Sequence, residues 1–258
     1  MMKRIIIFFA AWAIASVASA QTDSPLVFDT KGDNLGISVA GFKISLGESK
    51  GERESTLKSS KQVIAQFAGL SYGANVLTYE PNYGNWAGES DFMTDDIAST
   101  RLGIEALGLQ ISLNKKRTVF VKASMSANFD FFRFKNAMTM VENEDGILLP
   151  QQLSGAVKKS KMVASYIGAG AGFGFEVSCL KVIFDFNMDV LVGSHVKYKN
   201  PDKTKYHIGG FNNIRFRPGV SVLLNDLGVY ADYSLTPLFR EGVGNDGRVL
   251  SIGIRAGF

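Results

Sequence analysis

Carboxylate, serine and histidine side chains that could carry catalysis gather between residues 185 and 207. Asp185 and Asp189 are about 13 Å apart along an extended strand, too far to share a proton. Ser194 and His195 are adjacent, so on a strand they point to opposite faces, which argues against a Ser-His-acid hydrolase. His195 and His207 lack a cysteine or carboxylate at a spacing suited to a metal. We therefore expect no enzyme activity and no bound metal.

Alternating glycines at 168–174 could suggest a phosphate-binding loop. The dinucleotide-binding pattern is not completed, because Phe173 and Phe175 stand where it should continue. The glycines share one parity instead, which predicts a stripe on one face of a strand that leaves room for bulky neighbours such as Tyr230 or arginine. We expect no cofactor.

These residues lie in segments whose polar and apolar side chains alternate with period two, as in strands with two different faces. In 117–135, for example, Val121, Ala123 and Met125 share one face, whereas Lys122 and Ser124 share the other. Eight such segments can be drawn, at 63–78, 99–113, 117–135, 161–178, 180–198, 207–224, 227–239 and 248–258.

Short and long connections alternate strictly between the segments. The joints at 114–116, 179 and 225–226 are tight, whereas those at 79–98, 136–160, 199–206 and 240–247 are longer and polar. Short periplasmic turns and long outer loops are typical of outer-membrane barrels. The sequence predicts an all-β fold, a transmembrane antiparallel up-and-down β-barrel of eight strands occupying 63–258. A soluble sandwich with one wet face is the alternative.

Parity changes at two places. Near Leu107 the apolar face moves from even to odd positions, which predicts a β-bulge there. Residues 26–50 also alternate, but out of phase after Gly41, and we interpret them as a periplasmic strand or hairpin joined to the barrel by a polar linker at 51–62. Residues 21–62 thus form an N-terminal periplasmic segment. A ten-stranded barrel that uses the pair at 26–50 is the alternative.

The parity of the segments directs charged residues of both signs into the lumen of an eight-stranded barrel. Such a lumen is only wide enough for side chains to fill it, and buried charges must be paired. We expect an ion-pair network that plugs the barrel, with a narrow or gated pore as the alternative. The predicted lumenal residues are Arg101, Glu105, Lys122, Asp130, Glu176, Lys181, Asp185, Asp189, Arg215, Arg217, Asp232 and Arg255.

The N-terminus predicts export. Lys3 and Arg4 precede a short apolar run that ends in an Ala-x-Ala site, so residues 1–20 are interpreted as a cleavable signal peptide. Its removal lowers Lys+Arg from 28 to 26 against 24 acids, which leaves a net charge of about +2 and no basic stripe for nucleic acid. Cys179 is the single cysteine of the sequence, so an internal disulfide is excluded.

The C-terminal strand carries apolar residues at alternate positions and ends on an aromatic residue. This pattern, at Leu250, Ile252, Ile254 and Phe258, looks like the signal that barrel-assembly machinery is thought to read in outer-membrane proteins. It adds to the prediction that the protein is located in the outer membrane.

Several stretches resemble the PorT-like, porin-like family of outer-membrane β-barrels common in Bacteroidetes. They are FAGLSYGAN at 67–75, NFDFFRF at 128–134, GSHVK at 193–197, YSLTPLF at 233–239 and SIGI at 251–254. The resemblance covers about residues 63–258. Its motifs are structural, so it implies a barrel in a Gram-negative envelope. One member is linked to a secretion system, and nothing in these stretches singles out that role.

The long loops carry the residues expected to meet partners. Lys197, Lys199, Lys203 and Lys205 could bind lipopolysaccharide phosphates, or could simply be solvated. The apolar triplet at 147–149 could bind a partner or fold over the barrel mouth.

The function predicted from these features is that of a small, non-catalytic outer-membrane barrel with a structural or binding role. A narrow porin-like channel, a barrel lipid hydrolase and an accessory subunit of an envelope or secretion complex are the alternatives. The expected partners are outer-membrane lipid, lipopolysaccharide, the assembly machinery and an unidentified envelope protein, but not nucleic acid.

Overall fold

Strands make up all the regular structure of the residues that the structure describes. The structure is a computed structural model that describes residues 27–31, 34–39, 42–46, 63–66, 69–78 and 98–257, the last range without 115, 136, 156 and 158. Within these ranges no helix has the length and apolarity needed to cross a membrane.

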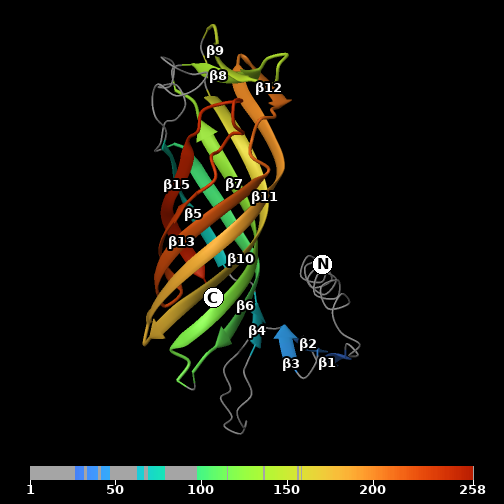
Figure 1. Ribbon diagram of the computed structural model, residues 1–258, viewed down its shortest axis with the longest axis vertical. Helices are drawn as coiled ribbons and strands as arrows, with labels where there is room; N and C mark the ends of the chain where they lie inside the picture. The colour runs from blue at the N-terminus through green and yellow to red at the C-terminus, as the bar shows by residue number, and fades with distance from the viewer. Residues whose placement is uncertain are drawn as a thin grey trace.

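Eight strands form a closed antiparallel barrel (Figure 1). Each strand pairs with the next along the chain, and the last pairs with the first. The predicted all-β fold with eight barrel strands is confirmed, and both the ten-stranded barrel and the soluble sandwich are wrong. The strands are β5 (Gly69–Thr78), β6 (Thr100–Ser112), β7 (Val119–Arg133), β10 (Lys159–Val177), β11 (Leu180–Asn200), β13 (Ile214–Leu224), β14 (Leu227–Tyr233) and β15 (Arg248–Gly257).

Four short strands precede the barrel: β1 (Val27–Lys31), β2 (Asn34–Val39), β3 (Phe42–Leu46) and β4 (Val63–Gln66). β1, β2 and β3 form an antiparallel sheet, and β3 pairs in parallel with β4. β4 pairs with the C-terminal part of β6, and β5 pairs with its N-terminal part. The segment predicted at 63–78 is therefore divided into two strands. The predicted signal peptide at 1–20 and linker at 51–62 lie outside the described residues.

One end of the barrel is closed by tight turns, and we call it the short-turn end. Two residues join β10 to β11 and two join β13 to β14. Asn225 and Asp226 both have positive φ, 47° and 70°, as a type I′ hairpin requires. Longer connections leave the opposite end, which we call the long-loop end (Figure 1).

Two bulges set which side chains face inward. The register of β6 against β7 shifts between Glu105 and Leu107, which confirms the predicted bulge. The second bulge was not predicted. Gly193 pairs with Ser165 and Leu191 pairs with Tyr166, so Val192 is an extra residue in β11. The extra residue changes which positions face inward: the inward residues of β11 are odd-numbered before Val192 and even-numbered after it.

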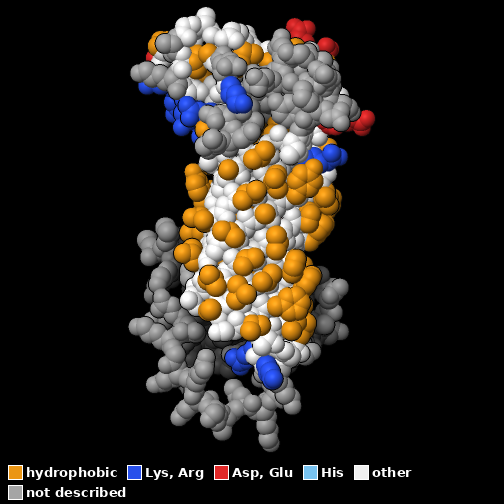
Figure 2. Space-filling model, turned by 90° about the vertical axis from the view of Figure 1, so that its left-hand side faces the viewer, with side chains coloured by type: hydrophobic (Ala, Val, Ile, Leu, Met, Phe, Trp, Pro, Cys, Tyr) orange, Lys and Arg blue, Asp and Glu red, His pale blue; other side chains and the backbone are white. Residues whose placement is uncertain are grey.

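The outer wall of the barrel carries exposed apolar side chains, which form the orange band in Figure 2. On β11, for instance, the even positions from 182 to 192 are all apolar. We call this surface the apolar belt. Its exposed members are Leu70, Tyr72, Leu113, Met125, Ile167, Phe173, Phe175, Val177, Leu180, Phe184, Phe186, Met188, Val190, Val192, Ile214, Phe216, Val220, Val222, Leu224, Leu227, Val229, Leu235, Ile252 and Ile254.

Beyond the belt, the long-loop end folds into a small second layer. β8 (Met138–Glu142) and β9 (Leu148–Gln152) form a hairpin, and β12 (Asp202–His207) pairs antiparallel with the end of β11. The predicted loops at 136–160 and 199–206 therefore contain strands. We call β8, β9, β12 and residues 208–213 and 234–247 the head. Met140, Leu148 and Ile208 of the head are fully buried in one cluster with barrel residues, so Leu148 of the triplet at 147–149 packs against the barrel.

Candidate functional site

Six buried charges form a closed ring inside the barrel. They come from β6, β7, β11, β13 and β14, and each arginine bridges two aspartates. Nitrogen–oxygen distances in the six pairs run from 2.5 to 2.9 Å, and no side chain exposes more than 9% of its surface. In order around this charge ring the members are Arg101, Asp130, Arg215, Asp189, Arg217 and Asp232.

Neutral side chains complete the ring. Asn75 donates to Asp130 over 3.0 Å, and the hydroxyl of Ser251 donates to Asn75. Asn128 donates to Asp189, and the Arg215 guanidinium lies 3.9 Å from the centre of the Tyr166 ring. The ring is electrically neutral, and these added contacts satisfy groups that would be costly to leave unpaired in a dry interior.

A second, smaller cluster lies nearer the short-turn end. Glu105 accepts from both Lys122 and Arg255, and Arg255 also donates to Asp185 over 2.8 Å and to Ser221. We call these charges the lower cluster. It is also neutral, but it is less buried than the ring, because Glu105 exposes 21% of its side chain.

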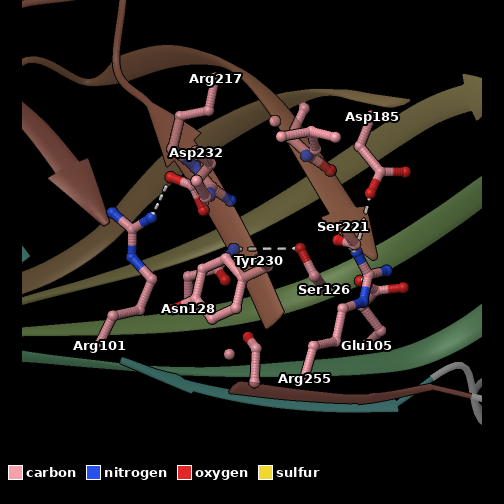
Figure 3. A pocket seen from close by; sticks show the side chains of 16 residues that line it. Arg101, Glu105, Ser126, Asn128, Asp185, Arg217, Ser221, Tyr230, Asp232 and Arg255 are labelled. Carbon is pink, nitrogen blue, oxygen red and sulfur yellow. Dashed lines mark hydrogen bonds and ion pairs between the residues drawn. The ribbon is translucent and has the colours of Figure 1, made fainter. Parts of the chain in front are cut away.

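A cavity of about 40 Å³ separates the ring from the lower cluster (Figure 3). Arg101 and Arg217 of the ring, Arg255 of the lower cluster and the Tyr230 ring all line it. The Tyr230 hydroxyl is buried without a hydrogen-bond partner among the described residues. A cavity of this volume is large enough for roughly two to four water molecules, at about 10–15 Å³ each.

The glycine stripe of β10 makes room for the acidic row of β11. Gly168, Gly170 and Gly172 lie opposite Asp189, Asn187 and Asp185 in the ladder. A Cβ on Gly168 would stand 2.1 Å from an oxygen of Asp189. The stripe thus leaves room for carboxylate and amide groups, whereas Tyr230 approaches a different glycine, Gly73 on β5.

Apolar side chains lie on both sides of the charged layer. Phe120, Ile183 and Leu223 are buried together towards the short-turn end. Towards the head, Tyr166 belongs to the core that includes Phe211 and Phe239, whose ring centres are 5.1 Å apart. The charges thus lie between two buried apolar layers, whose low polarity strengthens each ion pair.

Ten of the twelve predicted lumenal charges belong to the ring or the lower cluster, and two lie apart. Lys181 pairs with Asp226 in the β13–β14 turn, over 3.0 Å. Glu176 faces Lys181 across the β10–β11 ladder without joining either cluster. The sequence interpretation missed Asn75 and Ser251, although both stand at the inward parity of their strands.

The serine and histidine side chains do not form a catalytic arrangement. The Ser194 hydroxyl is buried and donates to the carbonyl of Ile208 over 2.5 Å, whereas His195 points to the other face. His207 lies directly opposite His195, and its Nδ1 is 2.9 Å from the backbone oxygen of Ser194. Burial, together with Lys205 and nearby lysines, lowers the pKa of His195. The described residues contain no group of three ligands suited to a metal.

The four lysines predicted to meet lipopolysaccharide lie on the paired strands β11 and β12. Lys197 is directly opposite Lys205, and Lys199 is directly opposite Lys203. They therefore share one face of a strand pair instead of lying scattered along a loop.

The C-terminal residues form part of the outer wall. Ile252 and Ile254 are exposed members of the apolar belt. Leu250 lies on the same face of β15 and is half-buried. Phe258 lies outside the described residues. Recognition of this strand by assembly machinery stays a prediction.

Comparison with known proteins leaves the fold and the site as the basis for any assignment. The resemblance to PorT-like barrels stays a prediction. No protein-family model matches the chain, and no curated protein matches it.

Proposed function

We propose that the protein is a small outer-membrane barrel, with the apolar belt in lipid, the short turns in the periplasm and the head outside the cell. The observation that carries this proposal is the inverted distribution of polarity: a neutral charged interior and an apolar exterior. Soluble monomers rarely expose an apolar surface of this extent. From Leu180 to Val192 the belt spans roughly 30 Å along the barrel axis at ordinary rise and tilt, close to the apolar height of such barrels.

We propose further that the barrel does not conduct solutes. The ring spans the interior from β6 to β14, and the buried Phe120, Ile183 and Leu223 lie below it. Moving an ion past them would require separating buried ion pairs, which costs several kcal/mol for each charge.

The role that remains is structural or binding, exerted through the head and without catalysis. In support, Ser194 makes its hydrogen bond to backbone and not to a histidine. Buried side chains of the head form one cluster with residues of the barrel strands, so the head presents a surface of strands packed on the barrel.

Cysteine labelling tests the placement. Cys179 is exposed in the β10–β11 turn, so a membrane-impermeant maleimide should label it only after the outer membrane is permeabilised. In a Cys179→Ser background, Asp145→Cys in the β8–β9 turn should react in intact cells. Labelling of Cys179 in intact cells would overturn the orientation, and recovery of the protein in a soluble fraction would overturn the location.

Planar bilayers test the closed interior. Reconstituted protein that migrates as a heat-modifiable, folded species should produce no conductance steps. Steady steps at neutral pH would instead favour a narrow channel.

A further inference from the structure

Cations gather in two rows on the face of the strands just beyond the apolar belt. The first row crosses four strands, because Arg133 on β7 lies opposite Lys161 on β10, Lys161 lies opposite Lys197 on β11, and Lys197 lies opposite Lys205 on β12. The second row, two residues further out, joins Lys159, Lys199 and Lys203. We call these seven residues the basic face.

Among the described residues, the basic face has no acidic partner. None of its seven members forms an ion pair with any residue that the structure describes. Like charges directly opposite one another on neighbouring strands destabilise a sheet. The arrangement places lysine against lysine in both rows, so it carries a repulsion that an external anion would relieve.

The position of the basic face indicates the kind of anion that would neutralise it. The Lys161 ammonium lies 4.4 Å from the centre of the Phe131 ring on the outer wall, so the first row adjoins the upper edge of the belt. Lys and Arg side chains border the orange belt at its upper edge in Figure 2. The rows are about 7 Å apart and their members about 5 Å apart, so several phosphates can be contacted at once.

We propose that the basic face binds the phosphate groups of lipopolysaccharide in the outer leaflet. This inference rests on the proposed placement in the outer membrane. The four lysines predicted from the sequence belong to this surface, which also includes Arg133, Lys159 and Lys161. Lysine suits this task, because its ammonium is a mobile point charge that can follow phosphates at variable positions.

A charge-matched pair of variants tests the inference. Lys197→Gln/Lys205→Gln removes two cations from the first row. Lys116→Gln/Arg240→Gln removes two exposed cations elsewhere on the described surface and serves as the control. Binding of purified lipopolysaccharide to folded protein in neutral detergent should weaken about ten- to thirty-fold for the first variant and hardly change for the control. The affinity of the parent protein should fall with added salt.

Three further ligands identify the source of the phosphate. Enzymatically dephosphorylated lipopolysaccharide, phosphatidylglycerol micelles and millimolar inorganic phosphate should each bind or compete much less well than intact lipopolysaccharide. Equal binding of the dephosphorylated form, equal binding of phosphatidylglycerol, full competition by inorganic phosphate or equal loss in both variants would each overturn the inference. Because the assay is done in detergent, these outcomes are independent of the labelling experiment that tests membrane placement.

Discussion

The charge ring and the basic face use the same kinds of side chain in opposite ways. Inside the barrel, three arginines alternate with three aspartates and every charge has two partners. On the outer surface, seven cations stand in rows, and lysines face lysines across the ladders.

The two arrangements differ because different counterions are available to the charges of each region. A charge enclosed by the barrel can be neutralised only by another residue of the chain, so the interior must contain both signs in equal number. A charge beyond the belt can be neutralised by solvent ions or lipid. Removing a charge should therefore be costly inside, and neutral or favourable outside.

The largest effect is expected from Asp130→Asn. The change leaves Arg101 and Arg215 each with one carboxylate instead of two, in a fully buried setting. Removing one partner of a buried pair costs about 3–5 kcal/mol of unfolding free energy. Urea unfolding in micelles, followed by heat-modifiable migration, measures the loss. Asp226→Asn, in the half-exposed pair with Lys181, is the control and should cost less than about 1 kcal/mol.

Crowding the ring without changing its charge should have the next largest effect. In Gly168→Ala the added methyl meets Asp189, which binds Arg215, Arg217 and Asn128. We expect a loss of about 1–3 kcal/mol in the same unfolding assay. Gly193→Ala is the matched control, since nothing lies within 4 Å of its added Cβ. Equal losses in both variants would show that strand propensity, and not the ring, sets the cost.

A smaller loss is expected when the lower cluster is broken. Glu105→Gln weakens the contacts with Lys122 and Arg255, but Glu105 is less buried than the ring carboxylates, and Arg255 lines the adjoining cavity. The cost should be about 1–2 kcal/mol. Glu176→Gln, outside both clusters, should change stability by less than about 0.5 kcal/mol. A loss for Glu105→Gln as large as that for Asp130→Asn would contradict the distinction between the clusters.

The smallest effect should have the opposite sign. Lys199 lies opposite both Lys159 and Lys203, so Lys199→Gln relieves two repulsions. In lipid-free detergent at low salt we expect a gain of about 0.2–1 kcal/mol, which high salt should abolish. Lys116→Gln in the short turn at 113–118 provides the control. A loss of stability for Lys199→Gln would mean that the basic face is neutralised from within the chain.

Strand number, short turns and inward charges were accessible from the sequence because each depends on local alternation. Parity alone directs Asp130 and Asp189 inward, and the change of parity at Leu107 identified a bulge in β6. Which charges meet was not accessible. Arg101 and Asp232 are 131 positions apart, and their contact depends on the stagger of the whole barrel.

The full extent of the basic face could not be predicted from the sequence, for a related reason. Lys197 to Lys205 form one stretch of sequence, but Arg133 and Lys161 join them only through strand pairing. The bulge at Val192 gives no sequence signal as clear as that at Leu107, because small and polar residues follow it at both parities. The strands of the head were not predicted, because 136–160 and 199–206 are rich in polar and charged residues and were interpreted as loops.

Contacts of both charged clusters cross the seam between β5 and β15. Arg101 on β6 pairs with Asp232 on β14, and Glu105 on β6 pairs with Arg255 on β15. The hydrogen bond between Asn75 and Ser251 joins β5 to β15 directly, although the two residues are 176 positions apart. These contacts connect strands from the two edges of the sheet. The ion pairs of the interior therefore stabilise the closure of the barrel as well as neutralise one another's charge.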